Sequence, residues 1–239
     1  QYRDDNEDTV NINTLAGYEK YAKDYLPDTV DTSDLFNVMS NHDVQGEGKI
    51  NRSEKLVIAK MLLNDINVDR IEVGSARVSE GEKDAVRMIC RYAKQIGKLK
   101  NVEVLGFVDG KKSVDWIDEC GCKVMNMLAK GSIKHCEGQL HKTPSEHVND
   151  IIAALDYART RDMDVNLYLE DWSNGMKDSP EYVYGMLDVL TKYDIKRFML
   201  PDTLGVLNPL QVIEFMRKMV KRYPDVHFDF HAHNDYDLA

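Results

Sequence analysis

KVMNMLAKGSIKHCEGQLHKTPSEHVNDIIAALDYARTRDMDVNLYLE, residues 123–170, is the stretch that decides the fold. It begins and ends with short apolar runs typical of strands, KVMNML (123–128) and VNLYLE (165–170). Between them, apolar residues recur every three or four positions over 144–161, as in an amphipathic helix. The helix is preceded by Thr143 and starts with Pro144, which are an N-cap residue and a first-turn proline. The order strand, helix, strand predicts parallel strands joined by a crossover helix.

The same alternation repeats outward from this stretch. Further strands are predicted at LFNVM (35–39), RIEVG (70–74), VEVLGF (102–107), KRFML (196–200) and HFDFH (227–231). Further helices are predicted at 53–65 and 82–97, and Ser179-Pro180 and Asn208-Pro209 mark the starts of two more. Seven strands separated mostly by single helices predict a parallel α/β sheet. Its closed form is a TIM (β/α)8 barrel and its open form is a doubly wound sheet.

The strand count sets the expected domain organisation. A TIM barrel needs eight strands, so we expect residues 35–239 to form a TIM-barrel catalytic-type domain that is incomplete after the seventh strand. Residues 1–34 contain a predicted helix near NTLAGYEKYAKDYL (13–26), which ends at Pro27. This N-terminal part either covers the open seam of the barrel or forms a loosely attached arm.

Composition narrows the class of protein. The 239 residues are 43% hydrophobic and 30% charged, which is enough apolar content for a globular core. No apolar run approaches the roughly 18 residues of a membrane-spanning helix, and the start QYRDDNEDTV lacks the basic and apolar regions of a signal peptide. We therefore expect a cytoplasmic protein that does not bind membranes.

Charge and cysteine content argue against nucleic-acid-binding proteins and disulfide-bonded proteins. The net charge of −10 argues against a nucleic-acid partner, because phosphate binding needs clustered Lys and Arg. The four cysteines include no C-x-x-C pair, which suits a reducing compartment. Cys120 and Cys122 are spaced closely enough to bind metal, but buried thiols are the interpretation that the general burial of cysteine favours.

Two histidines at the end of the last predicted strand, in FDFHAHND (228–235), raise the question of function. Side chains at positions i and i+2 of a strand point to the same face, so His231 and His233 project together. At the carboxyl end of a barrel strand, two neutral imidazoles could clamp one divalent ion. The alternative is a polar strand end whose histidines bind backbone and water.

Several motifs resemble one family of metal-dependent TIM barrels. HAHND (231–235), PDTLGVLNP (201–209), RIEVGSARVSEGE (70–82) and YLEDWSNG (168–175) look like the DRE-TIM metallolyase superfamily, which includes the 2-isopropylmalate, homocitrate and citramalate synthases. The resemblance runs from about residue 36 to the end. It implies a TIM barrel, a divalent metal ion (Mg, Mn or Zn) and acetyl-CoA as co-substrate. It also implies a 2-oxo acid as the acceptor, release of CoA, and a homodimer.

The resemblance assigns roles to five residues. His231 and His233 would bind the metal, Thr203 would bind the substrate carboxylate or hydroxyl, Glu170 would assist enolisation or orient water, and His135 would lie near the substrate. Structural alternatives remain open for three of them. Thr203 and Asp202 could form a turn, Glu170 and Asp171 could cap the next loop, and His135 could be a solvated loop histidine.

Other residues near these motifs carry weaker expectations. Lys130 and Lys134 could meet CoA phosphates or only solvent, and Asn234 and Asp235 could orient the histidines. Glu72 could point into the barrel or pair with Arg70 or Arg77.

The first strand departs from the family pattern. Relatives carry D-T-T-L-R-D-G-E-Q there, whereas this chain reads MSNHDVQGEG (39–48), with Val44 and Gln45 at the Arg and Asp positions. Losing a positioned cation from an active site typically costs about 3 kcal/mol or more of transition-state stabilisation. A slip of one residue would offer Asp43 or His42 as a substitute ligand, although Asp43 also fits a turn.

Three hypotheses follow from this conflict. The first is an active metal-dependent acyl-CoA:2-oxo acid C-acyltransferase of the 2-isopropylmalate or homocitrate synthase type. The second is a catalytically impaired relative that acts as a binding or interaction protein. The third is a retro-aldol lyase of the same superfamily, because the metal and the barrel would serve cleavage as well as condensation.

Overall fold

A computed structural model describes residues 2–3, 9–10 and 52–235 of the chain. Near its N-terminus, β1 (Tyr2–Arg3) pairs antiparallel with β2 (Thr9–Val10). The helix predicted at 13–26, the strand predicted at 35–39 and the degenerate tract at 39–48 lie outside the described residues. Within the described part, no helix is long and apolar enough to cross a membrane.

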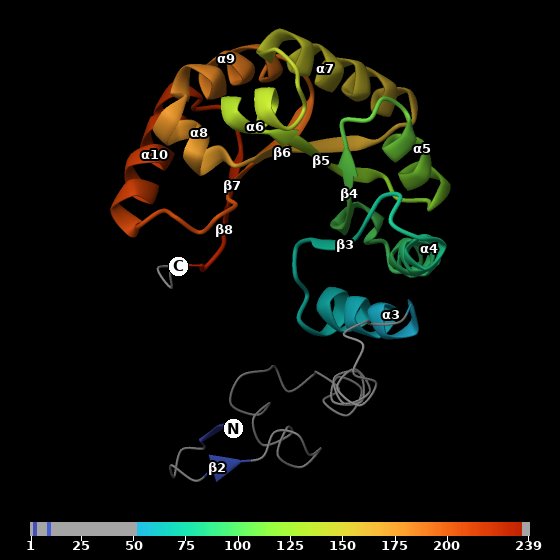
Figure 1. The fold of residues 1–239 in the computed structure, drawn as a ribbon. Coiled ribbons are helices and arrows are strands. Elements are labelled where there is room, and N and C mark those ends of the chain that lie inside the picture. Colours follow the sequence, from blue (N-terminus) through green and yellow to red (C-terminus); the bar gives the residue numbers. More distant parts are fainter. Residues whose placement is uncertain (1, 4–8, 11–51, 236–239) are drawn as a thin grey trace. The chain divides into compact units, whose positions relative to one another are not determined.

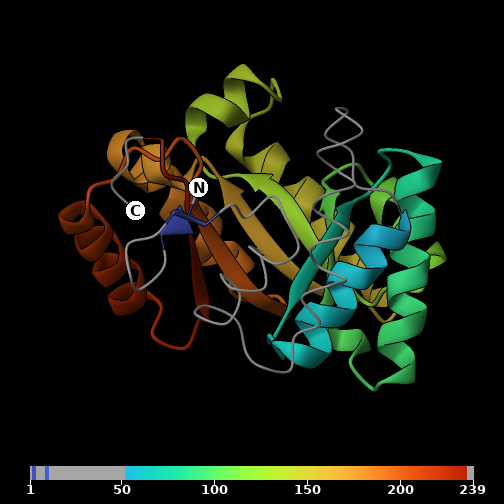
Figure 2. The ribbon, with the colours of Figure 1, turned by 90° about the horizontal axis from the view of Figure 1, so that it is seen from below.

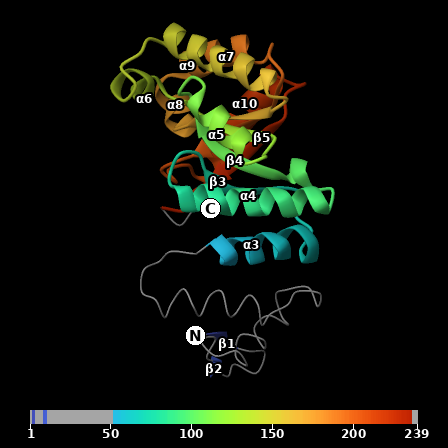
Figure 3. The ribbon, with the colours of Figure 1, turned by 90° about the vertical axis from the view of Figure 1, so that its right-hand side faces the viewer.

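The chain divides into two compact units, and the first contains residues up to 74 together with 78–103. Its described elements are α3 (Arg52–Lys60), the π-helical turn η1 (Met61–Asp65), most of β3 (Ile71–Ser75), α4 (Glu80–Gln95), the 3-10 turn η2 (Leu99–Asn101) and the start of β4 (Val102–Phe107). Helix α3 lies alongside α4 (Figures 1 and 3). Both helices bury small and aliphatic side chains, among them Ala59 of α3 and Ala85, Val86 and Ile89 of α4.

Two helix boundaries in this unit differ from the sequence-based expectation. The helix predicted at 53–65 is α-helical only to Lys60, after which one π-helical turn completes it. Helix α4 starts at Glu80, two residues before the predicted start, because Ser79 caps it: the Ser79 hydroxyl accepts a hydrogen bond from the Glu82 N–H at 3.1 Å. Capping chemistry therefore set this boundary more strongly than the apolar period did.

The second unit, residues 75–77 and 104–235, contains most of the sheet. After β4 come β5 (Val124–Lys130), β6 (Asp164–Glu170), β7 (Ile195–Asp202) and β8 (Phe228–Ala232), each parallel to the strand before it. Figure 2 shows β5 to β8 side by side, from yellow-green to red. Strands β3 to β8 follow chain order across one sheet. Six of the seven predicted strands are thus confirmed.

The helices of the second unit distinguish between the two predicted sheet forms. They are α5 (Lys112–Glu119), α6 (Ile133–Gly138), α7 (Pro144–Thr160), α8 (Trp172–Asp178), α9 (Pro180–Leu190) and α10 (Pro209–Arg222). Helices α7, α9 and α10 all cover the same face of β5 to β8 (Figure 1). A doubly wound sheet carries helices on both faces, whereas a barrel carries them only outside. The fold is therefore a partial TIM barrel.

Local chemistry explains where two of these helices begin. In α7, the Thr143 hydroxyl accepts from the Glu146 N–H at 3.3 Å, while the Glu146 carboxylate accepts from the Thr143 N–H at 2.8 Å. This is the capping box that the sequence predicts. Asn208 and Gln211 form the same reciprocal pair at the start of α10. Both helices then bury one apolar face on the sheet.

The face of the sheet opposite α7, α9 and α10 carries a row of hydrogen-bonded polar side chains across β5 to β8. The Asn166 amide donates to the Asn126 Oδ1 at 2.8 Å, and Arg197 Nε donates to the Asn166 Oδ1 at 3.2 Å. Arg197 Nη1 also pairs with Asp229 Oδ2 at 2.5 Å, and His227 Nε2 lies 2.8 Å from the other Asp229 oxygen. Arg197 is only 9% exposed, so the row pins the registers of four adjacent strands with polar contacts.

Candidate active site

The sequence-predicted site residues gather where β5 to β8 end. Register pairs Lys130 with Glu170 at the ends of β5 and β6, and Asp202 with Ala232 at the ends of β7 and β8. Because parallel strands finish at one edge, the loops that follow them meet there. This edge is where barrel proteins place their functional groups.

His231 and His233 lie side by side at the end of β8. Their ring centroids are 4.9 Å apart and the rings are nearly parallel, at 20°. The ring of Tyr168, from β6, lies 6.0 Å from that of His231. Burial lowers the pKa of His231 below its usual 6.5, and the charge of His233 lowers it further. The His231 imidazole is therefore neutral at pH 7, which is the form that binds a metal.

The donor set at this strand end includes the nitrogens of two adjacent imidazoles, which fit as ligands for a divalent ion. Among residues 52–235, however, no group of three or more His, Cys, Asp and Glu side chains could hold one. The pair would supply two ligands to such an ion, and further ligands would have to come from other residues, water or substrate.

The loop after β7 is fastened against the strand end that carries the histidines. Asp202 Oδ2 accepts from the Leu207 N–H at 2.8 Å, and the Asp202 carbonyl accepts from the Gly205 N–H at 2.9 Å and the His233 N–H at 3.4 Å. Gly205 has a φ of +57°, and a Cβ there would lie 2.6 Å from the Asp235 nitrogen. The PDTLG tract thus forms a tight turn that only glycine permits at position 205, and it holds the two loops together.

Asp171 links the loops after β5, β6 and β7. Its carboxylate is 1% exposed and accepts from the Ser132 hydroxyl at 2.7 Å and the Asn174 amide at 2.7 Å. The Nε2 of His135 lies 3.5 Å from the same carboxylate. The Asp171 N–H donates to the Thr203 hydroxyl at 2.9 Å, which leaves the Thr203 proton able to donate to a ligand. Asp171 has a strained backbone φ of +66°. In this conformation its carboxylate and its N–H make their contacts at the same time.

Glu170, at the end of β6, forms an ion pair with Lys130 of β5. Its carboxylate pairs with the Lys130 ammonium at 2.5 Å, and both side chains are largely buried, 22% and 16% exposed. Lys130 is therefore not a residue that contacts only solvent. Its expected contact with CoA phosphates stays a prediction.

The remaining sequence-predicted residues are dispersed. His135 is half-buried in the first turn of α6, so it is not a solvated loop histidine, and its Nδ1 is buried with no partner among the described residues. Lys134 is exposed on the same helix. Arg77 pairs with Asp109 at 2.6 Å. Glu72 is exposed on β3 in the first unit, where Arg70 lies 3.8 Å from Glu103. The four cysteines are buried free thiols.

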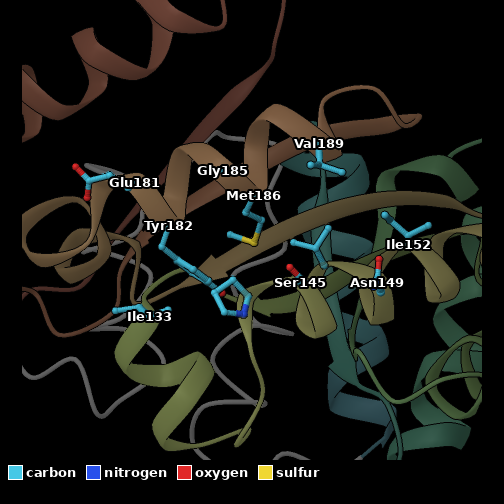
Figure 4. Close-up of a pocket in the computed structure, with 11 residues that line it drawn as sticks. Ile133, Ser145, Asn149, Ile152, Glu181, Tyr182, Gly185, Met186 and Val189 are labelled. Atoms are coloured by element: carbon cyan, nitrogen blue, oxygen red, sulfur yellow. The ribbon is translucent and has the colours of Figure 1, made fainter.

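A pocket of about 600 Å³ lies on the helical side of the sheet, away from these residues. Figure 4 shows Tyr182 and Met186 of α9 opposite Ser145 and Asn149 of α7 across it. None of the five residues assigned by the resemblance lines this pocket. The candidate site is therefore the strand edge and not this pocket.

Two features of the strand edge escaped the sequence analysis. One is the pairing of Lys130 with Glu170, and the other is the central position of Asp171. A signal for the first was present: β5 and β6 each carry an Asn four residues before the charged residue, Asn126 before Lys130 and Asn166 before Glu170. The equal spacing on neighbouring strands fits the observed register.

Parallel strands in chain order and helices on one face define a partial TIM-barrel protein, and its candidate site is the group of ionisable side chains at the carboxyl edge. Comparison with known families then places it more narrowly. The HMGL-like family model matches residues 45–239, and the chain belongs to this family. The resemblance to DRE-TIM metallolyases inferred from the motifs is thereby confirmed.

The curated relatives are distant synthases. The chain is 28% identical over 188 residues to the (R)-citramalate synthase of Methanocaldococcus jannaschii, covering 78% of this chain and 36% of the relative. It is 27% identical over 186 residues to the homocitrate synthase of Sulfolobus acidocaldarius, covering 78% and 39%. The chain thus spans less than half the length of these relatives.

Solved structures share the fold. The HMG-CoA lyase of Bacillus subtilis superposes with a TM-score of 0.61 at 22% identity, covering 77% of this chain and 62% of that one. The hydroxymethylglutaryl-CoA lyase of Pseudomonas aeruginosa gives 0.60 at 18% identity, covering 80% and 64%. At this identity the likeness concerns the partial TIM barrel alone, and it confirms that fold.

Proposed function

We propose that this chain carries the active-site half of a metal-dependent acyl-CoA:2-oxo acid C-acyltransferase. The observation that carries the proposal is the stacked pair His231 and His233 at the end of β8, on the edge that also holds Glu170 and Thr203. The curated names of two relatives, citramalate synthase and homocitrate synthase, point the same way. The reaction joins acetyl-CoA to a 2-oxo acid and releases CoA.

His231 and His233 would hold the divalent ion. When bound, the ion would supply Lewis-acid chemistry, drawing electron density from the carbonyl group of the 2-oxo acid. The lowered pKa of His231 keeps its imidazole available as a ligand at neutral pH. The turn at Gly205 holds the His233 backbone against the Asp202 carbonyl, so the histidine pair sits on a fixed loop.

Glu170 and Thr203 supply the proton chemistry in this proposal. The Glu170 carboxylate accepts a proton from the acetyl methyl group, and the carbanion so formed makes the new carbon–carbon bond to the carbonyl carbon of the 2-oxo acid. The carbonyl oxygen takes the electron pair of the broken π bond and then the proton held by Glu170, which gives the hydroxyl group of the product. Thr203 donates its hydroxyl proton as a hydrogen bond to substrate oxygen, because its own oxygen is occupied by the Asp171 N–H. Water then cleaves the thioester and CoA leaves.

Metal binding is the first test. The chelator-treated 239-residue chain is titrated with Mn²⁺ and with Zn²⁺ by calorimetry, beside a His231→Ala, His233→Ala double variant. We expect binding in about the micromolar range that the double variant loses, because two imidazole ligands are removed. His227→Gln is the matched control, since His227 is on the same chain segment but pairs with Asp229 on the polar row of the sheet.

Turnover is measured next, as CoA release from acetyl-CoA over a panel of 2-oxo acids with and without metal. We expect release that requires both metal and the histidine pair. A folded chain that binds no metal would overturn the proposal and would support the impaired, binding-only hypothesis. That hypothesis rests on Val44 and Gln45, which replace the Arg and Asp of relatives and lie outside the described residues.

A further inference from the structure

The candidate site presents an electrostatic problem for its proposed substrate. A 2-oxo acid is an anion, yet the strand edge carries the carboxylates of Glu170, Asp171, Asp202 and Asp235. Without a metal ion, an anion would therefore be repelled unless the chain itself supplies a cation among these carboxylates.

Lys130 is the cation in that position. It ends β5 four residues after Asn126, so both side chains point to the face of the sheet opposite α7, α9 and α10. Its side chain is 16% exposed, and its ammonium contacts Glu170 at 2.5 Å. An ammonium has three donor hydrogens, and this contact uses one of them.

The backbone of Lys130 is held from both sides by buried helix residues. Its N–H donates to His147 Nε2 of α7 at 3.0 Å, and its carbonyl accepts from the Tyr182 hydroxyl of α9 at 2.9 Å. A Cβ on the next residue, Gly131, would lie 2.4 Å from the Leu169 carbonyl oxygen, so β5 and β6 approach closely there. Because the backbone of Lys130 is already held in place, its long side chain loses less conformational entropy when it binds a ligand.

We propose that Lys130 binds the carboxylate of the anionic substrate and bridges it to Glu170. The identity of the ligand as a 2-oxo acid rests on the proposed function. In the free chain Glu170 occupies the ammonium, and in the complex the ammonium contacts both carboxylates. This places the substrate beside the group assigned as proton acceptor and offsets the repulsion from Asp171 and Asp202.

The competing explanation is a cross-strand ion pair that only stabilises the sheet. Lys130 and Glu170 are register partners, and such pairs contribute to sheet stability. That role requires no affinity for anions. Ligand binding measured on folded variants therefore separates the two explanations.

The experiment is a calorimetric titration of the 239-residue chain with pyruvate, in chelator so that metal does not contribute. We expect Lys130→Met and Lys130→Gln to weaken binding by about tenfold or more, the usual effect of losing a charge-assisted hydrogen bond. Lys130→Arg should retain most of the affinity. Lys134→Met is the matched control and should stay within about twofold, since Lys134 is exposed on α6.

The outcomes separate this inference from the proposed function. Circular dichroism and urea midpoints establish that each variant is folded, and Lys130→Gln keeps a donor for Glu170 if the Met variant is unstable. Equal pyruvate binding by folded Lys130 variants, or no binding by the parent chain, would overturn the role of Lys130. Metal-dependent CoA release would then still support the proposed function. Lys130-dependent binding without CoA release would support this site alone.

Discussion

At the scale of single residues, the buried His147 side chain of α7 holds the backbone of the candidate site at the end of β5. It is 1% exposed within α7, and its Nε2 accepts the Lys130 N–H. Burial lowers the pKa of His147 to about 4, with a smaller effect from the charge of Lys142. Only the neutral imidazole can accept this hydrogen bond, so protonation costs both the burial of a charge and the contact with β5.

The lowered pKa of His147 predicts a specific dependence of stability on pH. Between about pH 4 and 6.5 the unfolded chain binds the His147 proton more readily than the folded chain does, so stability falls as pH is lowered through this window. The full effect is on the order of 3 kcal/mol of unfolding free energy, reached near pH 4. Urea unfolding at several pH values measures it.

A His147→Gln variant isolates this contribution from that of the carboxylates. The Gln side-chain oxygen accepts a hydrogen bond without titrating. We expect the parent chain to lose more stability than the variant between pH 6.5 and 4. Parallel pH profiles for the two chains would show that His147 does not titrate as its burial requires.

Residue patterns predicted the strands well and the contacts poorly. The apolar runs and caps placed β4 to β8 and α7, because these signals are local to a few residues. The short helices α6 and α8 span six and seven residues, too few to show a helical period. The pairing of Lys130 with Glu170 depends on the register between strands 40 residues apart, which the apolar pattern of either strand alone does not fix.

At the scale of secondary-structure elements, two helical glycines have opposite surroundings. Gly175 in α8 packs against the loop after β5: a Cβ there would lie 2.0 Å from the Gly131 carbonyl oxygen and 2.9 Å from Val183 Cγ2. Gly185 in α9 lines the pocket on the helical side, and a Cβ there would meet nothing within 4 Å. The same substitution should therefore have opposite effects.

We expect Gly175→Ala to destabilise the chain by about 1–3 kcal/mol, because backbone must move to make room. Gly185→Ala should stabilise it by about 0.5–1 kcal/mol, since alanine favours a helix and nothing obstructs it. Urea midpoints of the two variants test the pair against each other. If both changes destabilised equally, helix context rather than close packing would govern these positions.

At the scale of the whole molecule, charge sets how anionic ligands approach. The chain carries a formal net charge of −10 at pH 7. Acetyl-CoA, the co-substrate in the proposed function, is also an anion, so the long-range field of the protein opposes its binding. Attraction for acetyl-CoA must therefore come from groups within contact distance of it.

Long-range repulsion and short-range attraction respond differently to salt, and this difference predicts the effect of salt on acetyl-CoA binding. Raising NaCl from about 0.02 M to about 0.2 M shortens the Debye length to less than the size of the protein, so it screens distant repulsion more than contacts in a buried site. We expect the dissociation constant of acetyl-CoA to fall a few-fold over this range, measured by calorimetry. An uncharged N-acetylcysteamine thioester is the control and should show no such change. A dissociation constant that rose with salt would instead reveal a basic surface for the CoA phosphates, and it would assign the main attraction to long-range charge.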